Sequence, residues 1–154
     1  MAQPKGSVGQ PIRSARKRAK RVRSVPKSSA VRIQVAAMAS EVAGIRHAIV
    51  ASAEACGIAP ELRSDIALAV SEACANVVTH AYLDAGTPGP LTVQADRKHH
   101  EFIVIVSDEG TGIAARSDSP GLGLGLDLIA RLTQRLEIGT NGLGGATLTM
   151  AFAA

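Results

Sequence analysis

The order of apolar and polar residues predicts strands and helices from residue 31 onward. Residues 31–35 and 91–96 alternate apolar and polar side chains, which is typical of strands with one buried face. Residues 101–107 are apolar on both faces, which indicates a central strand. Residues 136–140 and 146–152 are expected to be the closing strands, joined by a turn over 141–145. Helices are predicted over 41–56, from about 60 to about 81, and from the glycine-rich run that starts at 121.

Local signals set the expected helix boundaries. Ser40 is expected to cap the first helix, and Gly57 to end it in a left-handed conformation. Pro60 suits the first turn of the second helix, because proline has no amide hydrogen to lose there. The residues expected to face the core from the first helix are Val42, Ile45 and Ile49.

The second helix contains an unusual polar stripe. Glu72, Asn76 and His80 follow one another at i, i+4 and i+8, so they lie along one side of a helix. The stripe borders the predicted buried face rather than pointing fully to solvent. Because a helix between apolar neighbours needs no such row, it indicates a functional site.

Composition and charge divide the chain in two. The 154 residues fit one domain, and the 2% of aromatic residues predict an aliphatic core. Residues 1–30 hold nine of the 17 Lys and Arg residues and no acid, whereas the rest holds eight against 13 Asp and Glu, a balance of 8 − 13 = −5. We therefore expect a basic, disordered tail over 1–30 and a mildly acidic domain over 31–154. The tail is read either as a solubilising extension or as a contact for nucleic acid or an acidic partner, although it has no aromatic residue to stack on a base.

Several classes of protein are not indicated. Cys56 and Cys74 lack the spacing of metal ligands and are expected to be small apolar fillers. His99 and His100 are expected in a hairpin turn over 97–100, without further metal ligands. No apolar run has the length of a membrane span, and no apolar segment of a secretory signal follows the basic N-terminus. A cytoplasmic location is therefore expected.

Two glycine loops follow the polar stripe along the chain. Asp108, Gly110 and Gly112 come directly after the central strand, and Gly121, Gly123 and Gly125 open the third helix. Glycine lets backbone amides approach an anion, and a helix N-terminus favours negative charge, so a triphosphate would suit this place. Its magnesium would prefer oxygen ligands such as the Asn76 carbonyl, while Glu72 is placed to orient or deprotonate a nucleophile. Asp108 can accept a hydrogen bond from an exocyclic amine such as that of adenine.

The chain has neither the Walker pattern nor the motifs of the protein kinases. No Gly-Lys-Ser/Thr follows a glycine loop, and the chain has no lysine strand or His-Arg-Asp loop of the protein kinases. The combination Glu72-x3-Asn76-x3-His80-Ala-Tyr, Asp108-x-Gly110-x-Gly112 and Gly121-Leu-Gly-Leu-Gly instead resembles the N, G1 and G2 boxes of the Bergerat-fold (GHKL) ATPases. The run Ser117-Asp-Ser-Pro-Gly and the short lid are most similar to the small anti-sigma-factor serine kinases of bacterial partner-switching systems.

The resemblance implies an α+β fold, a two-layer sandwich with a mixed, mostly antiparallel sheet and helices on one face. It implies that Asn76 binds magnesium, that Glu72 is the catalytic base and that Asp108 binds adenine. Gly110 and Gly112 would shape the adenine loop, and Gly121, Gly123 and Gly125 would serve the lid and the phosphates. For His80, a nucleotide contact and a packing role both remain open. Family members often have Thr after the glycine of the closing strand, whereas here Ala146 follows Gly145 and Thr147 is expected to face the other side.

The implied function is that of a magnesium- and ATP-dependent serine/threonine kinase. It would phosphorylate a STAS-type anti-anti-sigma protein, sequester a sigma factor and form a homodimer. The alternatives are a nucleotide-gated binding module without kinase turnover, the ATPase domain of a histidine kinase, and a nucleic-acid binder led by the basic tail.

Overall fold

The structure is a computed structural model that describes residues 30–111 and 122–154. The predicted basic tail up to residue 29 and most of the predicted lid, with Gly112 and Gly121, lie outside the described residues.

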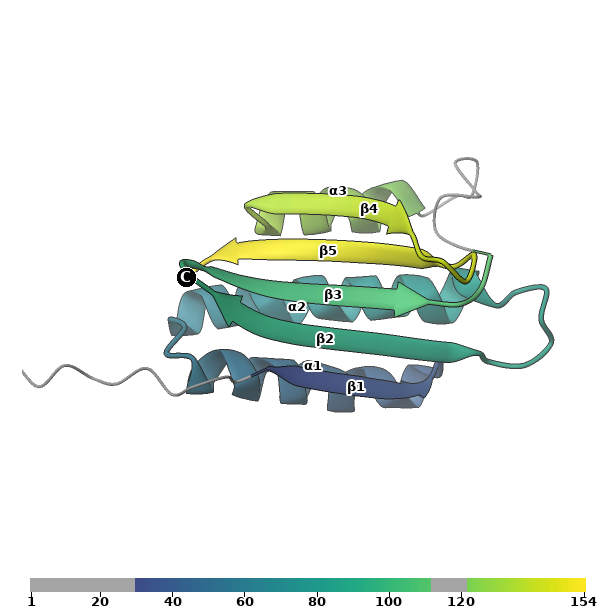
Figure 1. Cartoon of the computed structure of the whole chain (residues 1–154), viewed down its shortest axis with the longest axis horizontal. Helices are drawn as coiled ribbons and strands as arrows, with labels where there is room; N and C mark the ends of the chain where they lie inside the picture. Colours follow the sequence, from purple (N-terminus) through teal and green to yellow (C-terminus); the bar gives the residue numbers. More distant parts are fainter. Residues whose placement is uncertain (1–29, 112–121) are drawn as a thin grey trace, which may run out of the picture.

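The described chain forms a two-layer α+β sandwich, as expected (Figure 1). Three helices lie in one layer against one face of a five-stranded sheet of order β1-β2-β3-β5-β4. The sheet, expected to be mixed and mostly antiparallel, is antiparallel at all four of its described pairings. The elements in chain order are β1 (Val31–Ala36), α1 (Ala39–Ala55), α2 (Pro60–Asn76), the π-helix η1 (Val77–Ala81), β2 (Pro90–Lys98), β3 (Glu101–Asp108), α3 (Leu122–Leu132), β4 (Arg135–Thr140) and β5 (Ala146–Ala153).

The core lies between the two layers and is built mainly from aliphatic side chains. In β3 and β5 the residues that face the helices are buried, while their neighbours on the open face are partly exposed, except for the buried Ala151. Phe102 and Phe152, the only two phenylalanines, stand opposite each other in the register of β3 and β5 and are both fully buried. From the helices, Ile49 of α1 and Ile66 and Val70 of α2 fill the space between the layers. Burial raises the pKa of the Cys74 thiol in α2 to about 12. The thiol therefore stays neutral, which agrees with its expected role as a small apolar filler.

The ends of α1 confirm one predicted boundary and correct another. Gly57 has φ +76° and ends the helix, with its amide donating to Glu54 O and the Ile58 amide donating to Ala53 O at 3.0 Å. This is the paired bonding of a Schellman motif. Ser40 is not the N-cap: the helix begins one residue earlier, at Ala39, and the N-cap residue Met38 makes no side-chain capping bond.

The second helix begins and ends near the predicted residues, but its last turn is not α-helical. Pro60 is its first residue, and the helical path continues to Ala81. Over Val77–Ala81 the path widens into a π-helix, a form often found at functional sites. Beyond it, the β2–β3 turn is shorter than expected, because Arg97 and Lys98 belong to β2 and only His99 and His100 lie between the strands.

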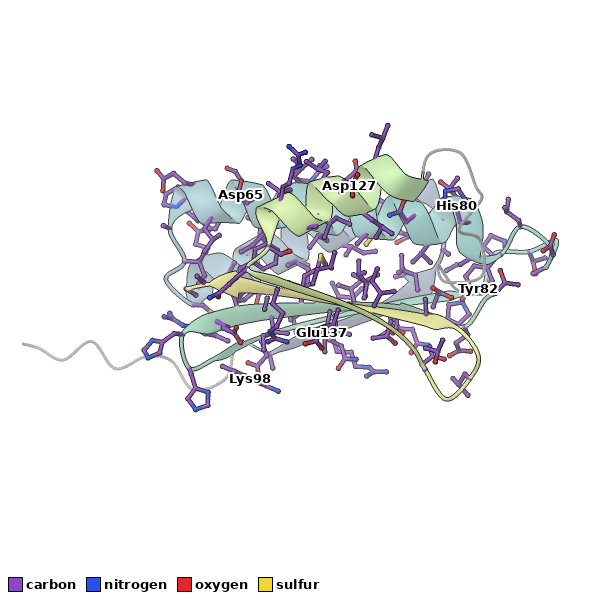
Figure 2. The ribbon with its side chains drawn as sticks, turned by 90° about the horizontal axis from the view of Figure 1, so that it is seen from above. Asp65, His80, Tyr82, Lys98, Asp127 and Glu137 are labelled. Carbon is purple, nitrogen blue, oxygen red and sulfur yellow. The ribbon has the colours of Figure 1, made fainter. Side chains whose placement is uncertain are left out.

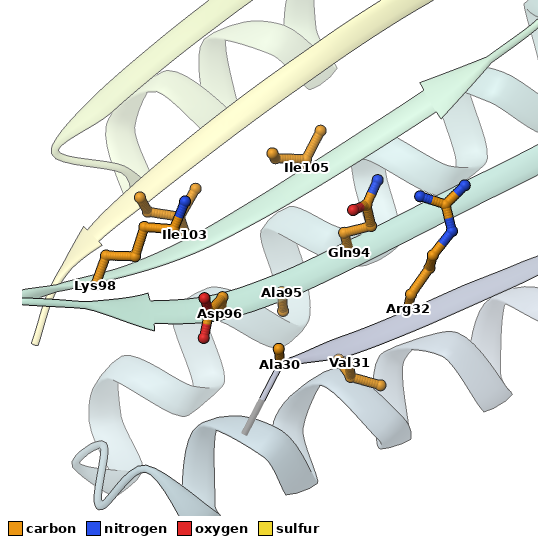
Figure 3. Close-up of a pocket in the computed structure, with 9 residues that line it drawn as sticks. All are labelled: Ala30, Val31, Arg32, Gln94, Ala95, Asp96, Lys98, Ile103 and Ile105. Atoms are coloured by element: carbon orange, nitrogen blue, oxygen red, sulfur yellow. The ribbon is translucent and has the colours of Figure 1, made fainter. Parts of the chain in front are cut away.

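No helix of the described residues covers the opposite face of the sheet (Figure 1), which carries both apolar and charged side chains. Figure 3 shows a shallow cavity of about 240 Å³ there, in which Ile103 and Ile105 lie among Arg32, Asp96 and Lys98. None of the predicted site residues lines it. No helix within the described ranges is both long and apolar enough to cross a membrane.

The two faces of β3 should differ in their contribution to stability. We expect Phe102→Ala to lower the free energy of unfolding by about 3–5 kcal/mol, because it leaves a cavity in the core. Ile103→Ala, on the adjacent residue of the open face, should cost about 1 kcal/mol or less. Urea denaturation of both variants measures the difference, and equal losses would show that the core is not where the structure has it.

Candidate functional site

The predicted site residues gather at one end of the sandwich. The carboxyl end of β3, the start of β5 and the end of η1 lie at the right-hand end of Figure 1. Figure 2 shows His80 and Tyr82 at this end and Lys98 at the other. Helix α3 reaches the same region with its first turns, because Gly125 lies beside Glu72 and Asn76 of α2.

Glu72 and Asn76 face the glycine-rich start of α3. A Cβ added to Gly125 would lie 3.2 Å from Glu72 Oε2 and 3.5 Å from each of the two polar atoms of the Asn76 side chain, Oδ1 and Nδ2. Glycine at this position therefore lets α3 approach the polar stripe more closely than a larger residue would. The Asn76 side chain is only 7% exposed, and its buried Nδ2 atom has no hydrogen-bond partner.

His80 does not continue the regular spacing of this stripe. It lies in the π-helix η1, whose wider turn changes the direction of each following side chain relative to an α-helix. The side chain is half-buried. The structure therefore places His80 at the same end of the molecule as Asn76, but not in the straight row that the α-helical spacing predicts.

Asp108 is buried at the junction of the helix and sheet layers. Its side chain is 1% exposed, and its Oδ1 atom accepts hydrogen bonds from the amides of Gly110 at 2.9 Å and Ala146 at 3.3 Å. The Oδ2 atom is also buried and has no partner. Burying a polar atom without a hydrogen bond is unfavourable, so Oδ2 is an acceptor for which the described residues provide no donor.

Asn141, in the turn between β4 and β5, supports Asp108 and was not recognised from the sequence. Its Nδ2 donates to Asp108 O at 2.6 Å, and its Oδ1 accepts from the amides of Leu143 and Gly145, each at 3.0 Å. The sequence signal was present, because asparagine before a glycine cluster often bonds to the backbone of its own turn. What the sequence does not show is that the same side chain reaches β3.

Two glycines allow close backbone approaches around Asp108. A Cβ on Gly110 would lie 2.0 Å from Ala81 O, and one on Gly145 would lie 1.9 Å from Asp108 O. Ala81 O, at the end of η1, also accepts a hydrogen bond from the Thr111 amide at 3.0 Å. The residues after β3 are thus fixed directly to the end of the polar helix.

Tyr82, which ends the His80-Ala-Tyr motif of the sequence, contacts both the core and the loop after β3. Its ring is partly buried against the core, but its hydroxyl accepts a hydrogen bond from the Glu109 amide. A cavity of about 490 Å³ opens beside it, lined in part by Tyr82, Glu109, Gly110 and Thr111. Tyr82 therefore belongs to the surroundings of Asp108.

The expected departure at the start of β5 is confirmed. Ala146 is buried on the face toward the helices and packs against Leu126 of α3, whereas Thr147 lies on the opposite face. The backbone amide of Ala146, rather than a side-chain hydroxyl, contacts Asp108.

Comparison with known protein families decides the class of protein. Residues 35–152 match the family described as "Histidine kinase-like ATPase domain". The chain belongs to this family. The match confirms the resemblance to the Bergerat-fold ATPases, and a comparison with curated proteins finds no match.

Two solved structures have a similar fold. One is the crystal structure of the RsbU and RsbW domains of Rv1364c from Mycobacterium tuberculosis, with TM-score 0.63, 22% identity and 80% of this chain covered. The present chain spans only 32% of that protein. The other is the SiaB–SiaC complex from Pseudomonas aeruginosa, with TM-score 0.58, 17% identity, and 80% of this chain and 88% of that chain covered. At these identities, the two matches show that the fold is shared.

The site fits the nucleotide of an ATPase-family domain. The buried Asp108 Oδ2 is an acceptor suited to an exocyclic amine, and Asn76 Oδ1 and Glu72 present the oxygen atoms that magnesium prefers. Among the described residues, no three His, Cys, Asp or Glu side chains form a group that could hold a metal. A magnesium ion here would therefore depend on few protein ligands, as is usual when phosphates complete its coordination.

The close approach at Gly145 can be tested by adding one methyl group. We expect Gly145→Ala to lower the free energy of unfolding by about 1–3 kcal/mol, because the new Cβ collides with the Asp108 carbonyl. Gly142→Ala in the same turn is the matched control, since its Cβ would meet nothing within 4 Å, and it should change stability by about 0.5 kcal/mol or less. If urea denaturation gives the same value for both variants, the contact between β5 and Asp108 is wrong.

Proposed function

We propose that the protein is a magnesium- and ATP-dependent serine/threonine kinase that phosphorylates a STAS-type anti-anti-sigma protein and regulates transcription by partner switching. The observation that carries the proposal is that two polar features, each containing a buried atom without a hydrogen-bond partner, lie at one end of the sandwich. One is Asp108 with its unpartnered Oδ2, and the other is the Glu72–Asn76 pair facing the start of α3. A member of the histidine kinase-like ATPase domain family would use the first for the base and the second for the phosphates.

Each residue has a proposed role. Asp108 accepts a hydrogen bond from the adenine amine, and Asn76 provides an oxygen ligand to magnesium. Glu72 orients the hydroxyl of the acceptor residue and takes its proton. Bound magnesium–ATP supplies the phosphoryl group and the metal charge that neutralises it.

The glycines are proposed to leave room for the nucleotide and for the segments around it. Gly110 lets the loop after β3 lie against Ala81 O, and Gly125 leaves room beside Glu72 and Asn76. Gly112, Gly121 and Gly123 are proposed to shape the adenine loop and to contact the phosphates. His80, half-buried in η1, is proposed either to contact the nucleotide or to pack at this end of the helix.

The proposed partners are a sigma factor and a STAS-domain protein, with a second copy of the chain forming a homodimer. Support comes from the similarity to an RsbW domain and to SiaB, which was solved in complex with SiaC. A partner-switching role would place the protein in the cytoplasm, where sigma factors act.

Transfer of phosphate can be tested directly with labelled ATP and candidate STAS-domain proteins. We expect the wild type to label a partner in the presence of magnesium and Asn76→Ala to label none, because the variant loses the proposed metal ligand. Thr79→Ala, on the exposed side of η1, is the matched control and should label as the wild type does. If the wild type labels no partner above the Asn76→Ala variant, the kinase proposal fails, although ATP binding could survive.

Glu72 separates a kinase from a nucleotide-gated binding module. We expect Glu72→Gln to lower the rate of phosphotransfer by at least about 100-fold while ATP affinity stays nearly unchanged, because a general base acts on the acceptor and not on nucleotide binding. Asp65→Asn, about two turns earlier on the same stripe, should change neither. The phosphotransfer rate is measured with labelled ATP, and the ATP affinity is measured by calorimetry. If both fall together in Glu72→Gln, the result favours the binding module.

A further inference from the structure

Tyr82 joins the end of η1 to the start of β2 and to the residue that follows β3. Its hydroxyl donates a hydrogen bond to Pro90 O at the start of β2, at 2.6 Å, and accepts one from the Glu109 amide at 2.8 Å. The ring lies against Gly89, where an added Cβ would be 2.1 Å from the ring atom Cε1. The packing of the ring and the two hydrogen bonds therefore fix the hydroxyl in one position.

The hydroxyl of Tyr82 and the amide of Asn141 act on the same peptide unit. Asp108 O and Glu109 N belong to the single peptide bond that follows Asp108. Asn141 Nδ2 donates to its oxygen at 2.6 Å, and Tyr82 accepts from its N–H at 2.8 Å. Both polar groups of this peptide are thus held by side chains, one from the β4–β5 turn and one from the residue that follows η1.

Holding this peptide limits where the Asp108 carboxyl group can point. The plane of the peptide fixes the backbone rotation after Asp108, and the Gly110 and Ala146 amides then hold Oδ1. Oδ2 is left buried and without a partner. Together these contacts limit the positions that the unpartnered Oδ2 atom can take before any ligand binds.

We propose that Tyr82 and Asn141 are positioning residues for base recognition, which clamp the Asp108–Glu109 peptide so that Asp108 Oδ2 is preset for an exocyclic amine. The proposal rests on the proposed function, in that the amine belongs to adenine. Neither residue touches the base itself. Their effect is pre-organisation, which lowers the cost of ordering the site on binding.

The ionisation behaviour of Tyr82 agrees with this role. Its pKa is raised, mainly by partial burial and also by the nearby Asp108 and Glu109 carboxyl groups, while the hydrogen bond from the Glu109 amide opposes the shift. The hydroxyl therefore keeps its proton at neutral pH and can donate to Pro90 O.

The test compares the binding of ATP and of inosine triphosphate, which has a carbonyl in place of the exocyclic amine. We expect the wild type to prefer ATP, and both Tyr82→Phe and Asn141→Ser to reduce that preference by between about twofold and tenfold, the effect of one hydrogen bond. Tyr82→Phe keeps the ring against Gly89 and removes only the hydroxyl. In an Asp108→Ala background, Tyr82→Phe should change the preference no further, because the atom that it positions is gone.

Thr133→Val is the matched control. It removes a hydroxyl that donates to Ile129 O at 2.9 Å, at the end of α3 away from Gly125, and should leave the ATP preference unchanged. Hydrogen exchange of the Glu109 amide tests the same contact in the absence of nucleotide. The exchange rate should be faster in Tyr82→Phe than in the wild type or in Thr133→Val, because the amide loses its acceptor.

The outcomes separate the two proposals. If the wild type prefers ATP but Tyr82→Phe and Asn141→Ser weaken ATP and inosine triphosphate equally, the two residues only support the loop and the positioning proposal is overturned alone. An unchanged exchange rate of the Glu109 amide in Tyr82→Phe also overturns it. If the wild type binds ATP no better than inosine triphosphate, both this inference and the adenine role of Asp108 fall.

Discussion

The burial of the Asp108 carboxyl group is the constraint on which the rest of this end of the molecule depends. A polar group placed between an aliphatic core and a sheet is unfavourable unless hydrogen bonds replace those of water. The described donors to its Oδ1 are backbone amides, one from the loop after β3 and one from the first residue of β5. The chain must therefore turn sharply after Asp108, and β5 must begin beside it. The site is in this sense a consequence of how one carboxyl group is satisfied.

The glycines at this end are explained by close approach more than by flexibility. Gly110 lies against Ala81 O, Gly145 against Asp108 O, and Gly125 against Glu72 and Asn76. Each contact joins a different pair of segments: the loop after β3 to η1, β5 to β3, and α3 to α2. A side chain at Gly110 or Gly145 would push the backbones apart and weaken the hydrogen bonds that the Gly110 and Ala146 amides donate to Asp108.

The sequence predicts the elements well and the long-range contacts poorly. Alternation and apolar runs locate the five strands, and Gly57 and Pro60 mark helix boundaries, because these signals act within a few residues. The prediction of a cap at Ser40 was wrong because α1 begins without a side-chain cap. The straight row through His80 was wrong because residues 77–81 form a π-helix, which the α-helical spacing does not describe. Asp108 is predicted as a site residue from its place at the end of a central strand, and the structure shows that it is buried there. The supporting roles of Tyr82 and Asn141 could not be predicted, because the bonds that define them join residues 27 and 33 positions apart.

Each half of the candidate site contains a buried polar atom that has no hydrogen-bond partner among the described residues. Asp108 has one oxygen held by backbone amides and one without a partner, and Asn76 has a buried Nδ2 without a partner. A buried group of this kind costs about 1–3 kcal/mol of stability. Both lie at the end of the sandwich where the glycine contacts bring α2, α3, β3 and β5 together. A ligand that bonds to these atoms recovers the energy that the free protein gives up, which is why binding at this site should stabilise the folded domain as a whole.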